Sequence, residues 1–180
     1  MAIVIDGTGS ITGLSAGGLP DGSITAADLA AGAARSNFGA GAVLQSVTAS
    51  FTNFSTSSTS TGTSASEWGS LTITPTASGN YLLVIAQGCC QYGTACLGES
   101  NCYITYEASG VSETVAATIT SGNETTNLRT YDAFGMTARI TTSTTNTYTI
   151  RMRANGKDVY SASKSCNWTN NRITVLEIAA

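Results

Sequence analysis

The sequence predicts an all-β fold, an antiparallel jelly roll or β-sandwich preceded by an extended, glycine-rich segment with one short helix. From Leu44 onward, apolar and polar residues alternate with period two, as in strands that pack one face on a core. These stretches are short and separated by turn residues, which is typical of two-layer β folds. Before Leu44 the chain consists mostly of small residues, interrupted by glycine every few positions. We therefore expect an N-terminal segment, 1–44, and a C-terminal β-sandwich head, 45–180.

The N-terminal segment offers few side chains from which a core could be built. Residues 2–7 (AIVIDG) have the pattern of a short strand that ends in an Asp-Gly turn. Over about 25–36 the spacing predicts a short helix, which Thr25 can cap, with Asp28 three residues later. A helix of this length is marginal in isolation, and its Ala and Gly surface suits close approach to copies of itself. A flexible tail is the alternative interpretation.

About eight stretches of the head have the pattern of strands. In the first of them, Val47, Ala49 and Phe51 alternate with polar residues. The run 80–88 (NYLLVIAQG) is continuously apolar, so we expect a central strand buried on both faces. The predicted strands are 44–54, 68–79, 80–88, 102–110, 115–123, 132–142, 147–157 and 172–180.

Two of the later stretches show the alternation most clearly. In 132–142, one face is apolar and carries Phe134, Met136, Ala138 and Ile140. In 147–157, one face is apolar and carries Tyr148, Ile150, Met152 and Ala154. Asn155 and Gly156 then form the strongest hairpin signal in the chain, so we expect a reversal there.

Composition excludes several classes of function. Only 11% of residues are charged and the net charge is -3, which argues against nucleic acid as a partner. Ser, Thr, Asn and Gly provide the polar surface instead, as suits an exposed extracellular surface. No stretch approaches the roughly 20 apolar residues of a membrane span. Residues 1–10 lack the features of a secretory signal, so we expect assembly in a cytoplasm.

The five cysteines are Cys89, Cys90, Cys96, Cys102 and Cys166. Since five is odd, at least one thiol is free or pairs between chains. Cys96 and Cys102 could close a short loop, and Cys89 or Cys90 could reach Cys166 across two strands. The spacing contains no CxxC pair and the chain has no histidine, so we favour disulfides or buried thiols over a metal site.

The absence of histidine also limits catalysis, because neither a Ser-His-Asp triad nor a Cys-His pair can be built. A two-carboxylate glycosidase would need a defined acidic pair. Glu99, Glu107, Glu113 and Glu124 are available, but their spacing singles out none. Residues 6–13 lack the lysine of a phosphate-binding loop. We expect no enzyme activity, no metal and no cofactor.

The N-terminal block carries a resemblance to a known family. The stretch "MAIVIDGTGSITGLSAGGLPDGSITAADLAAGAARSNFGAGAVLQSV" resembles the front half of short tail-fibre-like proteins of tailed phages, notably aquatic, cyanophage-like ones. The strands "ITPTASGNYLLVIAQG", "ARITTSTTNTYTIRMRANGK" and "ITVLEIA" are similar to that family's core strands. The cysteine-rich insert "GCCQYGTACLGESNC" departs from the family pattern.

The resemblance implies a homotrimer that forms part of a virion. Three chains would wrap around one axis and pool the few aliphatic side chains of their front segments, namely Ile11, Leu14, Leu19 and Leu29. The head would be a jelly roll similar to the trimeric C1q and tumour-necrosis-factor heads. The N-terminal segment would attach to other tail, baseplate or capsid proteins. The head would bind a host-surface receptor, lipopolysaccharide or another glycan, without inserting into a membrane.

Receptor-facing residues are expected on turns that combine amide and aromatic groups. The candidates are Tyr92, Glu99, Asn101, Asn123, Asn127, Lys157, Tyr160, Asn167, Trp168 and Asn170. Trp168 and Tyr160 could instead belong to the trimer core or a sheet face.

Three other functions compete with a tail fibre or short side fibre. A trimeric capsid cement protein would share the architecture but occur in hundreds of copies per particle. A polysaccharide depolymerase would need a long repetitive β-helix, and the sequence has no repeats. A secreted lectin-like domain would need a signal peptide.

Overall fold

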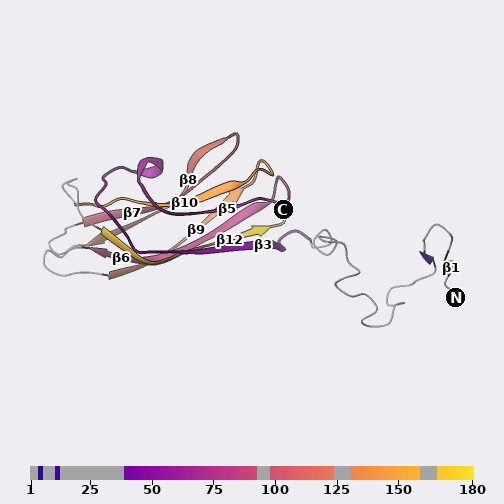
Figure 1. Cartoon of the computed structure of the whole chain (residues 1–180), viewed down its shortest axis with the longest axis horizontal. Coiled ribbons are helices and arrows are strands. Elements are labelled where there is room, and N and C mark those ends of the chain that lie inside the picture. The colour runs from indigo at the N-terminus through magenta and orange to yellow at the C-terminus, as the bar shows by residue number, and fades with distance from the viewer. Residues whose placement is uncertain (1–3, 6–10, 13–38, 93–97, 124–130, 159–165) are drawn as a thin grey trace. The chain divides into compact units, whose positions relative to one another are not determined.

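The structure is a computed structural model that describes residues 4–5, 11–12, 39–92, 98–123, 131–158 and 166–180 (Figure 1). The chain divides into two compact units, Met1–Phe38 and Gly39–Ala180. In the first unit, β1 (Val4–Ile5) pairs antiparallel with β2 (Ile11–Thr12). Of the strand predicted at 2–7, the structure describes Val4–Ile5 as a strand, and the other residues lie outside the described part. The helix predicted over about 25–36 lies outside the described residues, as do Leu14, Leu19 and Leu29.

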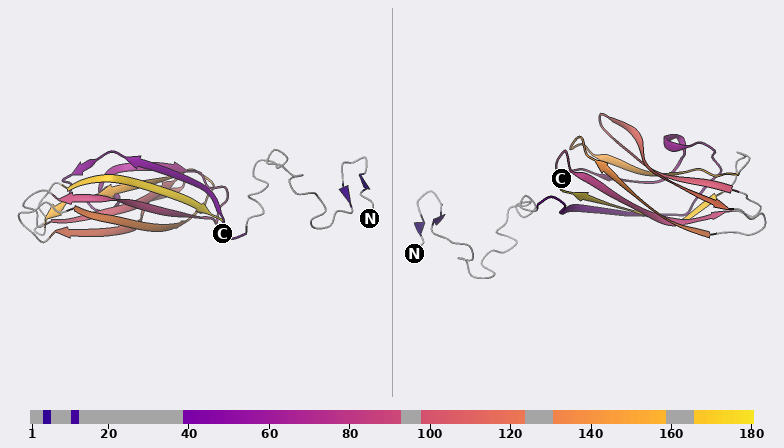
Figure 2. Two further views of the ribbon diagram at one scale, coloured as in Figure 1. Left: turned by 90° about the horizontal axis from the view of Figure 1, so that it is seen from below. Right: turned by 180° about the vertical axis from the view of Figure 1, so that it is seen from behind.

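The second unit, which we call the head, consists of two antiparallel sheets that lie face to face (Figures 1 and 2). The first, here the β12 sheet, has the order β3 (Val43–Phe51), β12 (Cys166–Ile178), β6 (Tyr81–Tyr92) and β9 (Tyr131–Thr141), with β4 (Phe54–Thr56) also pairing with β12. The second, here the β10 sheet, has the order β5 (Ser66–Ile73), β10 (Tyr148–Ala154), β7 (Gly98–Ala108) and β8 (Val111–Asn123), with β11 (Lys157–Asp158) also pairing with β7.

The chain crosses between the two sheets at most connections. Of the long strands, β7 and β8 are the one consecutive pair joined within a sheet. This order, with β3, β12, β6 and β9 facing β5, β10, β7 and β8, is that of a jelly roll. A short 3₁₀ turn (Gly62–Ser64) lies in the crossing from β4 to β5. The predicted antiparallel sandwich is confirmed.

The core lies between the sheets and is closed at one end by aromatic rings. Trp68 and Trp168 stack with their ring centroids 6.5 Å apart, and Phe134 packs edge-on against Trp168 at 5.2 Å. Phe51 packs edge-on against Trp68 at 5.9 Å. The inward faces predicted for 132–142 and 147–157 are confirmed, since every residue named for them is buried.

Two expectations about the strands were wrong in part. Leu82 and Val84 of β6 are fully buried, but Leu83 and Ile85 on the outer face are only half-buried, because no second layer among the described residues covers that face. Asn155 and Gly156 do not form a hairpin. The chain continues from β10 into β11 along the same partner, β7, because the Asn155 amide donates to the Asn101 carbonyl.

The connections expected to face a receptor begin and end at one end of the sandwich. The pairs Tyr92 with Cys166, Gly98 with Asn123, and Gln91 with Tyr131 are strand-end partners there. At the opposite end, Ile178 pairs with both Val43 and Tyr81 (Figure 1). Val43, where the first long strand of the head begins, therefore lies at the end opposite to these connections.

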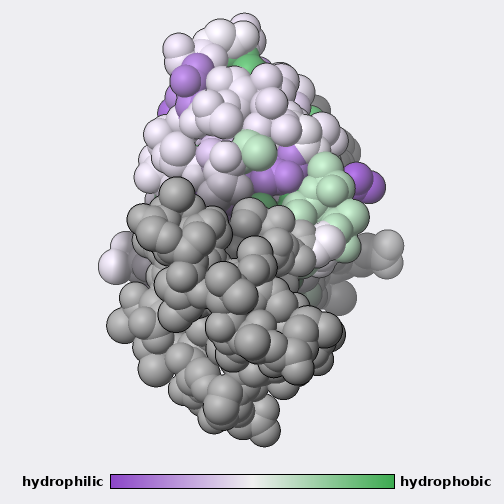
Figure 3. Space-filling view, turned by 90° about the vertical axis from the view of Figure 1, so that its right-hand side faces the viewer, coloured by the Kyte–Doolittle hydropathy of each residue, from purple (hydrophilic) through white to green (hydrophobic). Residues whose placement is uncertain are grey.

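The visible head surface in Figure 3 is mostly of intermediate hydropathy, with a few hydrophilic residues and a small apolar patch. This matches a surface built from Ser, Thr and Gly rather than from charges. In the described part of the chain, no helix has the length and apolar character needed to cross a membrane.

Candidate functional site

The most irregular part of the β12 sheet is a bulge in β12. The register between β12 and β6 shifts between Thr169 and Arg172, so that Asn170 and Asn171 lie opposite the single residue Gly88. Asn170 has a φ of 54°, in the left-handed region that asparagine tolerates better than most residues. On the other side of β12, the partner strand is interrupted between Phe51 of β3 and Phe54 of β4.

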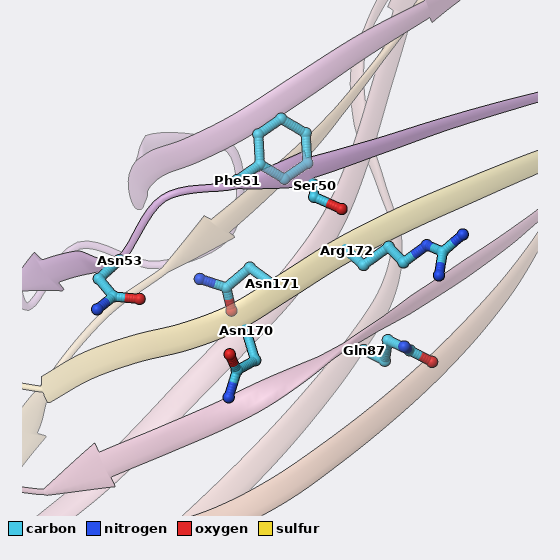
Figure 4. Close-up of a pocket in the computed structure, with 7 residues that line it drawn as sticks. All are labelled: Ser50, Phe51, Asn53, Gln87, Asn170, Asn171 and Arg172. Carbon is cyan, nitrogen blue, oxygen red and sulfur yellow. The ribbon is translucent and has the colours of Figure 1, made fainter.

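Two adjoining hollows open at this interruption, and we call them together the amide groove. The larger has a volume of about 340 Å³ and is lined by Ser50, Phe51, Asn53, Gln87, Asn170, Asn171 and Arg172 (Figure 4). The smaller has a volume of about 260 Å³ and is lined by Asn53, Phe54, Ser55, Gln91, Asn167 and Thr169. The two adjoin because Asn53 lines both.

Carboxamides dominate the lining of the amide groove. Figure 4 shows the Asn171 side chain reaching toward Asn53, with Asn170 beside it, while Arg172 extends the other way. Arg172 is the one charged residue among the described lining residues, and no carboxylate is among them. Carboxamides both donate and accept hydrogen bonds but do not transfer protons near neutral pH. The lining therefore suits recognition of polar neutral groups.

Asn171 is the most unusual member of this lining. Its exposed fraction is 1%, yet neither its Nδ2 nor its Oδ1 has a hydrogen-bond partner in the described part of the chain. Gly88 makes room for this amide, because a Cβ built there would lie 2.5 Å from Asn171 Oδ1 and 2.6 Å from a carbon of the Phe134 ring. Buried polar atoms are nearly always paired in native proteins.

The structure brings two of the predicted receptor-facing residues into the groove, since exposed Asn170 lines the larger hollow and half-buried Asn167 the smaller. Two others are corrections. Trp168 is 1% exposed, and its indole lies in the core. Asn101 is 7% exposed, and its side chain hydrogen-bonds with Asn155 and Thr120 instead of facing solvent.

The remaining predicted residues are located by backbone alone or not at all. Those at strand ends, whose side chains are not described, are Tyr92, Glu99, Asn123 and Lys157. Asn127 and Tyr160 lie outside the described residues, and Ile11 is placed only as part of β2.

Four lining amides were missed, namely Asn53, Gln87, Gln91 and Asn171. The doubled asparagine at 170–171 breaks the period-two alternation of β12, and that break was a usable signal for a bulge.

The cysteines are not chemically equivalent. Cys90 is disulfide-bonded, and its partner's side chain lies outside the described residues. Cys89 and Cys102 carry free thiols, so the short-loop bridge of Cys96 with Cys102 is not formed, and neither is one from Cys89 to Cys166. Cys102 cannot reach a loop partner because it faces the core, where burial raises the pKa of its thiol. No group of metal-ligating side chains occurs among the described residues.

Of the four carboxylates considered for an acidic pair, Glu107 and Glu113 lie outside the groove and are engaged with arginines, while the side chains of Glu99 and Glu124 lie outside the described residues. On the outer face of the β10 sheet, Arg151 pairs with Glu67 at 3.1 Å and with Glu107, and Arg153 pairs with Glu113 at 2.7 Å. Burial opposes ionisation of Glu113, but the hydrogen bonds from Arg153 and Thr105 outweigh it and hold the pKa of this carboxyl below its usual value. These contacts identify a structural ion-pair network.

Comparison with known proteins gives no family. No protein-family model matches the chain, and no curated protein matches it. Among solved structures, the VP2 subviral particle of infectious bursal disease virus matches with a TM-score of 0.39 and 16% identity, over 75% of this chain and 32% of that chain. Eiger TNF from S. frugiperda matches with a TM-score of 0.40 and 10% identity, over 73% of this chain and 94% of that chain.

The C-terminal domain of EclA, a sugar-binding protein, matches with a TM-score of 0.38 and 12% identity, over 76% of this chain and 89% of that chain. The chain spans about a third of the length of the viral chain. TM-scores this low carry no inference about function, which we argue from the residues of this chain.

Proposed function

We propose that this chain is a structural protein of a phage virion, a trimeric tail fibre or short side fibre whose head binds a host-surface glycan. The observation that carries the binding part is the amide groove. Amide and hydroxyl side chains around a partly exposed phenyl ring form the kind of lining that recognises sugar hydroxyls. The resemblance of the N-terminal block to tail-fibre-like proteins supports the virion part.

The outer face of the β12 sheet supports self-association. Tyr81, Leu83 and Ile85 on β6 and Leu176 on β12 lie half-buried on this face, and Leu83 pairs directly with Leu176. Aliphatic side chains side by side on a sheet face that no other described layer covers are what a second copy of the chain would cover. We propose that this strip and the N-terminal segment both contribute to the trimer.

The proposal includes no catalytic step. The described lining of the groove contains no carboxylate and no thiol, and the chain has no histidine, so the serine and threonine hydroxyls of the lining have no general base beside them. Binding without turnover is the expected behaviour of the head.

Two measurements test this proposal. Light scattering of the intact chain at micromolar concentration is expected to give three times the 18.3 kDa of one chain, and a monomer would contradict the trimer. In electron micrographs of virions that carry the chain, gold-labelled antibodies against it are expected to bind at the tail. Labelling spread evenly over the capsid would identify a cement protein instead, and unlabelled particles would contradict a virion role.

A further inference from the structure

We propose that Asn171 anchors a saccharide subsite in the larger hollow of the amide groove, and that the sugar it takes is neutral. The sugar would pair with Asn171 through a group that offers a hydrogen-bond donor beside an acceptor. Two adjacent ring hydroxyls have this character, and so does an acetamido group. The inference rests on the proposed glycan-binding function and adds the residue and the ligand class.

The first argument is the state of the Asn171 side chain. It is buried to 99% and lines the hollow, and both of its polar atoms lack partners in the described residues. The other large buried polar side chain of the same strand, Glu177, accepts four hydrogen bonds. An unpaired amide at the wall of a polar hollow gains two hydrogen bonds when a ligand supplies the missing acceptor and donor.

The second argument is the backbone that holds the amide there. The bulge places two residues of β12 opposite Gly88, and the absence of a side chain at Gly88 leaves room for Asn171 Oδ1. Asn170 keeps the bulge in place with a left-handed backbone and presents its own amide at the rim. These features bring three carboxamides, those of Asn53, Asn170 and Asn171, to one end of the hollow (Figure 4).

The third argument is chemical and selects the ligand class. A carboxamide presents an acceptor oxygen and a donor nitrogen side by side. A carboxylate or phosphate could accept from Nδ2 but would be repelled by Oδ1, and an ammonium group would satisfy Oδ1 alone. Adjacent hydroxyls or an acetamido group satisfy both atoms. Arg172 lines the same hollow but extends away from Asn171, so an anion paired with its guanidinium would lie away from this amide (Figure 4).

The fourth argument is size. The larger hollow, at about 340 Å³, lies at the lower end of small-molecule sites, which span about 300–1,000 Å³. It therefore suits one sugar ring at Asn171. The smaller hollow continues past Asn53 and could hold a second ring of the same glycan.

Calorimetric titration of the intact chain tests this inference. The probes are the methyl glycosides of mannose, galactose and glucose, together with N-acetylglucosamine, which separates the acetamido group from the hydroxyl pair. Methyl glucuronide is the acidic probe. At least one neutral probe is expected to bind, and Asn171→Leu is expected to weaken that binding at least tenfold. The matched control is Asn146→Leu, an exposed amide on the β9–β10 turn, which should bind as the unsubstituted chain does.

A readout on the unsubstituted chain covers the case in which Asn171→Leu fails to fold. The side-chain amide signals of Asn171 in a nitrogen–proton correlation spectrum should shift on addition of the bound sugar, while those of Asn146 should not. Equal binding by the intact chain and Asn171→Leu, or unmoved Asn171 signals, would overturn this inference and leave glycan binding intact. Tighter binding of the glucuronide than of every neutral probe would overturn the ligand class. Binding of no saccharide, on this panel or on a glycan array, would overturn the proposed function itself.

Discussion

Asn171 and Glu177 lie on the same strand, face the same side of it, and differ in whether their polar atoms are paired. Glu177 Oε1 accepts from the Thr76 amide at 2.7 Å, the Thr76 hydroxyl at 2.8 Å and Asn80 Nδ2 at 2.7 Å, while Oε2 accepts from Gln45 Nε2 at 2.6 Å. A buried group with this many partners contributes to stability, whereas an unpaired one detracts from it. We therefore expect substitution of Asn171 and substitution of Glu177 to change the stability of the head in opposite directions.

Replacing Asn171 with leucine is expected to stabilise the free head. Leucine has a similar volume and leaves no buried polar atom unpaired, so the gain in unfolding free energy should be about 1–2 kcal/mol. Urea unfolding at fixed protomer concentration measures it. A loss of stability would show that the amide has a structural role, which the ligand-anchoring role does not require.

Replacing Glu177 with glutamine is expected to lower stability at neutral pH by about 1–3 kcal/mol, because the amide nitrogen would face at least one of the present donors. Urea unfolding measures the loss. Glu67→Gln is the control. Glu67 is more than a third exposed in its ion pair, so its change should be about 1 kcal/mol or less. Equal losses in the two variants would contradict a special role for Glu177.

The same contacts make stability depend on pH. Burial alone would raise the pKa of Glu177, but the hydrogen bonds from Asn80, Gln45 and Thr76 outweigh it and lower the pKa below the ordinary 4.5. The pKa of Glu177 is lower in the folded chain than in the unfolded chain. The stability that its ionised carboxylate contributes is therefore fully present above pH 4.5 and is lost as the pH falls through the folded-state pKa. The difference in stability between the intact chain and Glu177→Gln should therefore shrink on acidification, which unfolding at two pH values would show.

At the scale of elements, the bulge in β12 depends on the left-handed backbone of Asn170. Asn170→Gly should leave stability nearly unchanged, because glycine adopts this conformation without strain. Asn170→Val should lower it by about 1–2 kcal/mol, because a β-branched residue is disfavoured there. Thermal unfolding of the pair checks this. Similar unfolding temperatures for Asn170→Gly and Asn170→Val would contradict the left-handed backbone at Asn170.

The strands of the head were largely predictable because their signal is periodic. The alternation in 132–142 and 147–157 assigns each side chain to one face, and burial follows from it. The signal at Asn155 and Gly156 misled because two buried asparagines hold the chain extended: Asn101 donates to Asn155 Oδ1, and the Asn155 backbone N–H donates to the Asn101 carbonyl. Such a tertiary contact leaves no local trace in the sequence.

The candidate site was less predictable than the fold for a similar reason. The search for polar residues on turns predicted Asn167 and Asn170, but Asn53 and Gln87, from other parts of the chain, also line the groove. Only the register of β3, β6 and β12 brings them together. Trp168 was a receptor-facing candidate, with the trimer core or a sheet face as the alternative, and it is buried because the alternation of β12 directs it inward.

At the scale of the whole molecule, the division at Phe38 and Gly39 predicts that the head folds without the N-terminal unit. The expected boundary at 44 would remove Val43, which pairs with Ile178, so the truncation should instead end at Phe38. Residues 39–180 alone should give a β-type circular dichroism spectrum and unfold cooperatively, yet fail to join the virion. A truncated chain that still attached would place the anchor in the head.

The most direct test of the central claim is a crystal structure of the intact chain with the best-binding neutral saccharide. We predict a sugar ring in the larger hollow, with one group accepting from Asn171 Nδ2 and a neighbouring group donating to Asn171 Oδ1. A sugar bound elsewhere on the head, with the Asn171 amide still unpaired, would contradict the claim.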